Sequence, residues 1–169
     1  MTFSLRRLAD GFRARHGEHA RIVRFLKSYR ASESLNAHYV GGWARVTRDE
    51  ALRGGLIIVQ AREGIHARLM RERLREFNVT RLPDVSEHSR RQAMALFATD
   101  RYSDRQKLDA LASLIEHYDA IFAPVNRLIG DIRADAQTAQ MLRLMLDDEY
   151  ATTQWFARMR DRPVRAQHC

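Results

Sequence analysis

The stretch LIIVQAREGIHARLM, residues 56–70, decides the expected fold because its apolar and ionisable residues share a helical spacing. Intervals of three or four residues place one set on a single face of an α-helix: Leu56, Val59, Glu63, His66 and Met70. A carboxylate and an imidazole are therefore expected to face the core. Burying such groups is costly unless they are paired or bind a metal ion, and Glu-x-x-His is a spacing at which one helix offers two metal ligands. A hydrogen-bonded core histidine is the simpler alternative.

The composition predicts a single domain without cysteine chemistry. A chain of 169 residues is long enough to bury one core. The one cysteine, Cys169, excludes a disulfide framework or a thiolate cluster, so any metal ion would be held by oxygen and nitrogen. Residues 1–20 lack the continuous apolar segment of a secretory signal, and no run of apolar residues is long enough to span a membrane. We therefore expect a cytoplasmic protein.

The charge is strongly basic, with 29 Lys and Arg residues against 21 Asp and Glu. This balance suggests nucleic acid or an anionic membrane surface as a partner. The arginines are nevertheless spread from Arg6 to Arg165 without a basic block, and no nucleic-acid-binding motif is present, which disfavours nucleic acid. Residues 1–17, with Phe3 and Phe12 among arginines, form a basic N-terminal arm that is expected to pack on the body or touch a membrane surface.

Helical spacing and helix-end signals divide the rest of the chain into four long helices and one short helix. The expected segments are a helix from Glu18 to the Gly41-Gly42 pair, one from the Thr47 capping box to about Phe77, a short one at 86–99, one from Ser103 or Asp104 to Gly130 with a kink at Pro124, and one from about Ala134 to 160. Residues 18–160 thus predict an all-α four-helix bundle in which two helical hairpins are joined by a long crossover containing the short helix. Residues 161–169 are expected to be a flexible tail.

One glutamate falls near the middle of each long helix, on its expected inner face: Glu33, Glu63, Glu116 and Glu149. Glu33 and Glu63 are 30 residues apart and lie nearly symmetrically about the first predicted turn. Glu116 and Glu149 are 33 apart and flank the second turn in the same way. Each hairpin is therefore expected to bring its two glutamates to one level. Four carboxylates facing one another repel strongly unless protons or cations neutralise them, and two divalent ions would do so.

This arrangement resembles the ferritin-like superfamily of di-iron carboxylate proteins, which includes bacterioferritin and rubrerythrin. The family pattern places Glu on the first and third helices and Glu-x-x-His on the second and fourth. Matched residue by residue, the resemblance implies these metal ligands: Glu33, Glu63 with His66, Glu116 and Glu149. Thr152 stands where the second histidine belongs, and threonine is a poor ligand for a transition metal. Asp119, one turn after Glu116, could replace it or could be a solvated surface acid.

A looser similarity links the chain to the demethoxyubiquinone hydroxylases, a ferritin-like branch that hydroxylates a quinone precursor at the membrane. It rests on the order of four features: Leu82-Pro83, the crossover helix, Glu116-His117-Tyr118 and Asp147-Asp148-Glu149. The second Glu-x-x-His of that branch is absent here. This similarity is therefore one option for the substrate class.

The resemblance to the superfamily implies dioxygen activation at two iron ions or at a manganese–iron pair. Glu63 and Glu149 would bridge the ions, Glu33 and Glu116 would each bind one, and His66 would supply nitrogen. The implied reaction is oxidation or hydroxylation of a small organic substrate, or oxidation of ferrous iron. The missing histidine leaves an alternative, a degenerate bundle with one metal ion or none that serves as a structural or interaction module. A nucleic-acid-associated role is a second alternative, and a homodimer is compatible with an amphipathic bundle.

Overall fold

The structure is a computed structural model that describes residues 2–162, so most of the predicted tail lies outside the described residues. Seven α-helices and no strand occur in the described range. They are α1 (Thr2–Val46), α2 (Glu50–Glu76), α3 (Glu87–Phe97), α4 (Asp104–Ala110), α5 (Ala112–Glu116), α6 (Tyr118–Asp131) and α7 (Ala136–Asp161). The all-α prediction is therefore confirmed.

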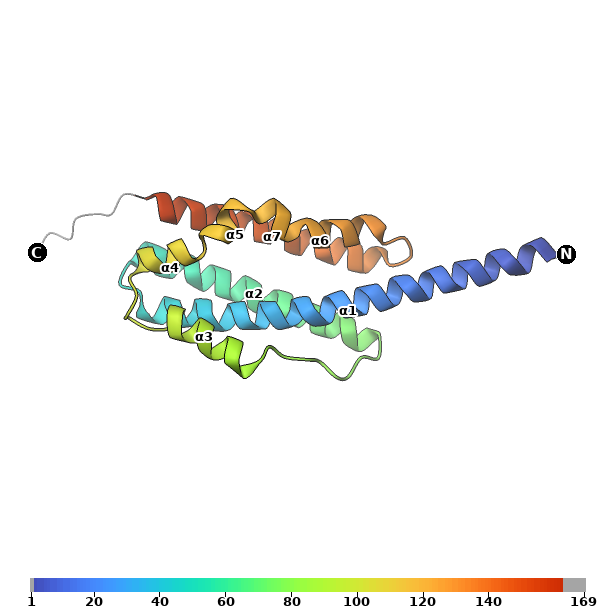
Figure 1. The fold of residues 1–169 in the computed structure, drawn as a ribbon, viewed down its shortest axis with the longest axis horizontal. Helices are drawn as coiled ribbons and strands as arrows, with labels where there is room; N and C mark the ends of the chain where they lie inside the picture. Colours follow the sequence, from blue (N-terminus) through green and yellow to red (C-terminus); the bar gives the residue numbers. More distant parts are fainter. Residues whose placement is uncertain (1, 163–169) are drawn as a thin grey trace, which may run out of the picture.

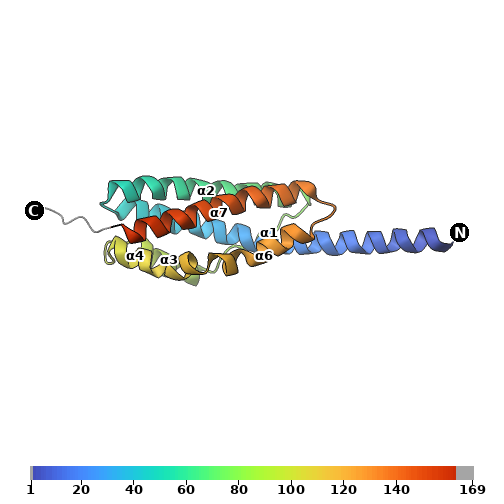
Figure 2. The same cartoon turned by 90° about the horizontal axis from the view of Figure 1, so that it is seen from above.

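The long helices lie side by side, with α1 packed along α2 in both views (Figure 1, Figure 2). The helix α7 contacts α2 and also α4, α5 and α6, which follow one another along it. The short helix α3 belongs to the connection between α2 and α4 and packs against α1 (Figure 1). The first part of α1 extends beyond the other helices (Figure 1).

The first helix continues through the glycine pair that was expected to end it. α1 runs to Val46, and no glycine among the described residues has a positive φ. A Cβ added at Gly42 would lie 2.5 Å from the Cβ of Ala98, and one at Gly41 would overlap the side chain of Gln60. The prediction of a glycine stop was wrong, because these glycines allow α2 and the end of α3 to approach α1 closely.

The second helix begins close to its predicted start but uses another cap. Asp49 is the N-cap of α2, and its carboxylate accepts a hydrogen bond of 3.0 Å from the backbone N–H of Leu52. The hydroxyl of Thr47, the predicted cap, donates instead to the Asp104 carboxylate at 2.6 Å. Thr47 therefore ties the first turn to the start of α4.

The third long helix is broken into α4, α5 and α6, with breaks at Leu111 and His117 rather than only a kink at Pro124. Pro124 lies inside α6. The buried residues of these helices include Leu108, Leu111, Ile115 and Phe122. Glu116 follows Ile115 directly, which turns it about 100° away from the core, and it is exposed. The prediction that Glu116 and Asp119 face the core was wrong, since both side chains are exposed.

Two apolar clusters fill the bundle at different heights. One contains Ile22, Leu26 and Leu74 with the first half of α7, and the other contains Trp43, Leu56 and Phe156 with their neighbours. Along α1, α2 and α7, four buried ionisable residues fall between the two clusters: Glu33, Glu63, His66 and Glu149. The core therefore has a polar layer enclosed at both ends by apolar side chains.

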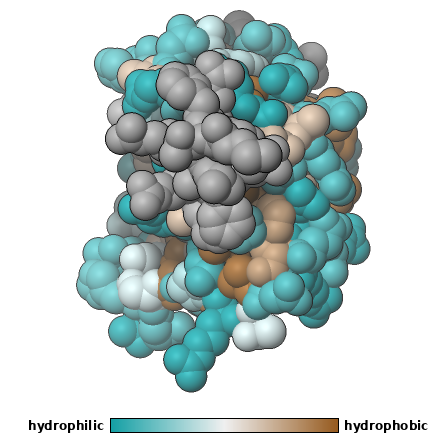
Figure 3. Space-filling view, turned by 90° about the vertical axis from the view of Figure 1, so that its right-hand side faces the viewer, coloured by the Kyte–Doolittle hydropathy of each residue, from teal (hydrophilic) through white to brown (hydrophobic). Residues whose placement is uncertain are grey.

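The described residues at one end of the molecule form a mostly polar surface (Figure 3). Seen from the end toward which α1 extends, hydrophilic side chains cover much of the visible surface, with apolar side chains between them (Figure 3). Among the helices of residues 2–162, none contains an apolar stretch long enough to cross a membrane.

Candidate metal centre

Four ionisable residues make up the polar layer at mid-height of the bundle. Their exposed fractions are 1% for Glu33, 3% for Glu63, 3% for His66 and 8% for Glu149. Glu33 comes from α1, Glu63 and His66 from one face of α2, and Glu149 from α7. The symmetric spacing of Glu33 and Glu63 about the first turn explains why they meet at one level.

Three of these residues point one atom each at a common point. His66 Nδ1 lies 3.4 Å from Glu33 Oε2 and 3.4 Å from Glu149 Oε1. One ligand atom from each residue lies within 4.8 Å of the other two. Each of these three atoms is buried and has no hydrogen-bond partner within the described part of the chain. A buried polar atom without a partner is costly, so the geometry fits a cation between the three side chains.

The other ring nitrogen of His66 is held by a carboxylate. His66 Nε2 lies 3.2 Å from Asp148 Oδ2, and Asp148 Oδ1 lies 3.5 Å from Arg62 Nε. When Nε2–H donates to Asp148, the lone pair of Nδ1 is directed toward Glu33 and Glu149. Metal-binding histidines are commonly fixed in this way by a carboxylate on their second nitrogen.

Glu63 lies beside these three residues, and the charges of Glu33 and Glu149 affect its pKa. Asn36 donates a hydrogen bond of 3.0 Å from Nδ2 to Glu63 Oε2. Burial raises the pKa of Glu63 well above its usual value, and the nearby carboxylates of Glu33 and Glu149 raise it further. Without a metal ion, Glu63 therefore holds a proton more strongly than an ordinary carboxyl group.

The pKa values of the other residues follow from the same crowding. Burial raises the pKa of Glu149, against the opposing effect of His66. Burial alone lowers the pKa of His66, but the carboxylates of Glu149 and Glu33 outweigh it and raise the pKa to about 10. An imidazolium at His66 thus neutralises part of the layer when no metal is bound. A metal ion must displace that proton to bind Nδ1.

Only some of the predicted ligands meet. Glu33, His66 and Glu149 converge, and Glu63 is adjacent. Glu116 instead forms an ion pair of 3.0 Å with Arg160 at the surface, and Asp119 is exposed, so neither faces the layer. We therefore remove both residues from the candidate site, because they lie on the exposed side of α5 and α6.

The position of the missing second histidine is occupied differently. Thr152 is buried, and its Oγ1 lies 3.5 Å from Arg62 Nη1. The same guanidinium faces Asp148. A positive side chain therefore stands near the place where the superfamily pattern expects a second nitrogen ligand.

Sequence reasoning missed three residues that contact the layer or the residues around it. Asn36 and Tyr29 share the inner face of α1 with Glu33, at intervals of three and four residues, but no role was assigned to them. Arg62 lies directly before Glu63, off the helical face that Leu56, Glu63 and His66 share. One feature of the sequence could have identified Arg62: it directly precedes Glu63, just as Asp148 directly precedes Glu149.

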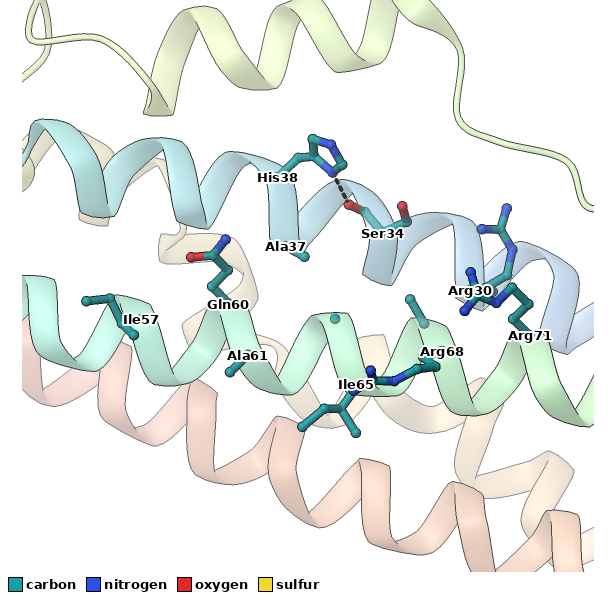
Figure 4. A pocket seen from close by; sticks show the side chains of 12 residues that line it. Arg30, Ser34, Ala37, His38, Ile57, Gln60, Ala61, Ile65, Arg68 and Arg71 are labelled. Carbon is teal, nitrogen blue, oxygen red and sulfur yellow. Dashed lines mark hydrogen bonds between the residues drawn. The ribbon is translucent and has the colours of Figure 1, made fainter.

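A large surface hollow beside α1 and α2 is not the entrance to this site. It has a volume of about 710 Å³ and lies in the groove between α1 and α2 (Figure 4). Ile57, Ala61 and Ile65 line it together with Arg68 at one side. None of the four buried ionisable residues lines this groove. A smaller cavity, described below, reaches Glu33 and Glu149.

Comparisons with models of protein families, with curated proteins and with solved structures found no match for this chain. The class of this protein is therefore described from its fold and its candidate site alone. It is an all-α protein with a buried Glu–His–Glu group that could bind a metal ion.

Proposed function

We propose that this protein binds a divalent transition-metal ion through Glu33, His66 and Glu149. The observation that carries the proposal is the convergence of three buried, unpartnered ligand atoms from three helices. One imidazole and two carboxylates suit Fe(II), Mn(II) or Zn(II), because imidazole favours the later metals and carboxylate the harder ones. Asp148 supports the assignment, since it orients the histidine from outside.

The charges favour one ion over two. The carboxylates of Glu33 and Glu149 balance one divalent ion, while Asp148 faces Arg62. A second ion would have only Glu63 and shared oxygens as ligands, because Glu116 and Asp119 lie on the surface. These ligand positions therefore favour a ferritin-like bundle with one metal ion over one with a complete pair of iron ions or a manganese–iron pair.

The proposed chemistry is oxidation of a small organic substrate with dioxygen. A bound iron ion would supply one-electron chemistry. The chain's own residues would hold that ion away from water, because the apolar clusters above and below the layer close both ends. Glu63, buried beside the ion, would be the carboxyl group placed to exchange a proton there.

The test is metal stoichiometry. We expect anaerobic Fe(II) and Mn(II) titrations, followed by calorimetry, to give one equivalent per chain. Glu149→Gln should abolish that binding, and Glu87→Ala, on the exposed start of α3, should leave it unchanged. Two equivalents would restore the two-metal interpretation. An absence of uptake at neutral pH would refute metal binding.

The pKa of His66 favours one alternative, a degenerate bundle that works as a structural or interaction module. A buried imidazolium between two carboxylates neutralises the layer without any ion. This alternative predicts that purified protein contains no transition metal, and that adding one does not raise its thermal stability. A ligand that binds only the folded state would raise that stability.

A further inference from the structure

A second cavity reaches the polar layer from the side of the broken third helix. It has a volume of about 320 Å³ and lies between α1 and the segment formed by α5 and α6. Glu33 and Glu149 line it, so it leads directly to two of the proposed metal ligands. The third helix was expected to present carboxylates here. It presents Leu114 and Phe122 instead.

Most of the cavity wall is apolar. Phe25 and Tyr29 from α1 form an edge-to-face ring pair with centroids 5.3 Å apart. Phe122 stands on the α6 side, where it packs edge-to-face on Tyr150. Ile121 lies at the edge, with 45% of its surface exposed. Aromatic side chains in edge-to-face pairs can extend the same packing to a bound ring.

One polar group in the wall has no assigned role. The Tyr29 hydroxyl is buried and makes no hydrogen bond of good geometry in the described part of the chain, with the Glu33 carboxylate as its nearby acceptor. Burial and the carboxylates of Glu33, Glu149 and Glu63 raise the pKa of this phenol, so it remains a neutral O–H donor. Buried hydroxyl groups are normally well paired. A ligand oxygen in the cavity would supply an acceptor in place of Glu33 when that carboxylate binds a metal ion.

We propose that this cavity binds a neutral aromatic molecule of one or two rings, whose oxygen accepts a hydrogen bond from Tyr29. The size agrees, because a cavity of about 150 Å³ is enough for benzene. Two carboxylates in the wall exclude an anionic ligand unless a metal ion neutralises them. The inference rests on the proposed function only for the reaction of such a substrate, since binding itself requires no metal.

Fluorine NMR titration of metal-free protein with fluoronaphthol and fluoronaphthalene tests the proposal. We expect saturable binding of both, with fluoronaphthol bound about fivefold more tightly because of one additional hydrogen bond. Tyr29→Phe should remove this preference. Ile121→Glu at the edge should weaken both probes at least tenfold, and Ser32→Phe, across the opening on α1, is a second blocking variant. The control is Ile58→Glu, which changes another exposed isoleucine, on α2, that does not line the cavity, and it should change nothing.

A second measurement locates the probe. Bound Mn(II) is paramagnetic, so it should broaden the fluorine signal of a probe in the cavity beside Glu33 and Glu149. Binding without broadening in manganese-loaded protein would overturn the proposal, as would equal effects of Ile121→Glu and Ile58→Glu. If Mn(II) does not bind at all, the proposed function fails, and the metal-free titrations still decide the cavity.

Discussion

Asp148→Asn tests whether the carboxylate beside His66 serves the metal site. The substitution keeps the size of the side chain and an oxygen that can accept from His66 Nε2–H, now 3.2 Å from the carboxylate. It removes the negative charge that fixes the tautomer with Nδ1 toward Glu33 and Glu149. Loss of such a partner usually lowers metal affinity by about 10–100-fold. The Asp148 side chain is 43% exposed, so solvent screens its charge and we expect the lower end, about tenfold.

An opposing effect is smaller. Removing Asp148 also lowers the pKa of His66, which makes the competing proton easier to displace. Among the groups that raise this pKa, however, Asp148 contributes less than Glu149 and Glu33. The loss of orientation should therefore dominate, and the one-to-one stoichiometry should remain.

The assay is competitive titration of Mn(II) at fixed neutral pH, with Asp147→Asn as the matched control. Asp147 is the exposed neighbour of Asp148 on α7, and its substitution removes the same charge without touching His66. An equal loss of affinity in both variants would mean that only the general charge of the protein matters. Unchanged affinity in Asp148→Asn would refute the proposed orientation of His66.

Three further predictions concern stability and binding. Glu33→Gln should abolish Mn(II) uptake while chemical denaturation still shows a cooperatively folded protein; retained uptake would place the ion elsewhere. In metal-free protein, the raised pKa values of Glu63 and Glu149 mean that the folded state binds protons more tightly than the unfolded state. The free energy of unfolding should therefore fall as the pH rises above about 4.5 and passes through the folded pKa values of these two groups. The stabilising contribution of protonated His66 should persist above neutrality and disappear near pH 10, and urea titrations across this range would reveal a flat profile if the layer were solvated. Gly42→Ala should destabilise the folded protein by about 1–3 kcal/mol, because the new Cβ meets Ala98. Gly54→Ala in α2, where a new Cβ has nothing within 4 Å, should stabilise it by about 0.5–1 kcal/mol. Thermal melts that shift in the same direction for both variants would contradict this packing.

Helical periodicity was sufficient to predict the inner face of α2. Leu56, Val59, Glu63, His66 and Met70 are all buried, as their spacing indicates. Burial at such a position depends only on local geometry and on one apolar stripe. The all-α class of the fold followed from the same pattern, as did the burial of Glu33 on α1 and Glu149 on α7.

The third helix shows where this reasoning fails. Glu116 was assigned to the inner face although its direct neighbour Ile115 already occupies the centre of that face, and neighbours in sequence are turned about 100° from each other around a helix. The breaks at Leu111 and His117 were not predicted, because no glycine or proline marks either position in the sequence. The contact between Asp148 and Arg62 was likewise not predicted, because it joins two residues that are 86 positions apart in the chain and lie on different helices.

The position of the polar layer is itself an argument for function. Replacing buried ion pairs by apolar residues often leaves a protein equally or more stable, so stability alone does not explain three buried carboxylates and a histidine at one level. Apolar side chains already fill the core on both sides of this layer. A cavity lined by Tyr29 and Phe122 leads from the surface to this layer, where Glu33 and Glu149 form part of its wall. A site built only to hold the bundle together would need no such opening, whereas a metal ion that acts on a bound molecule requires one.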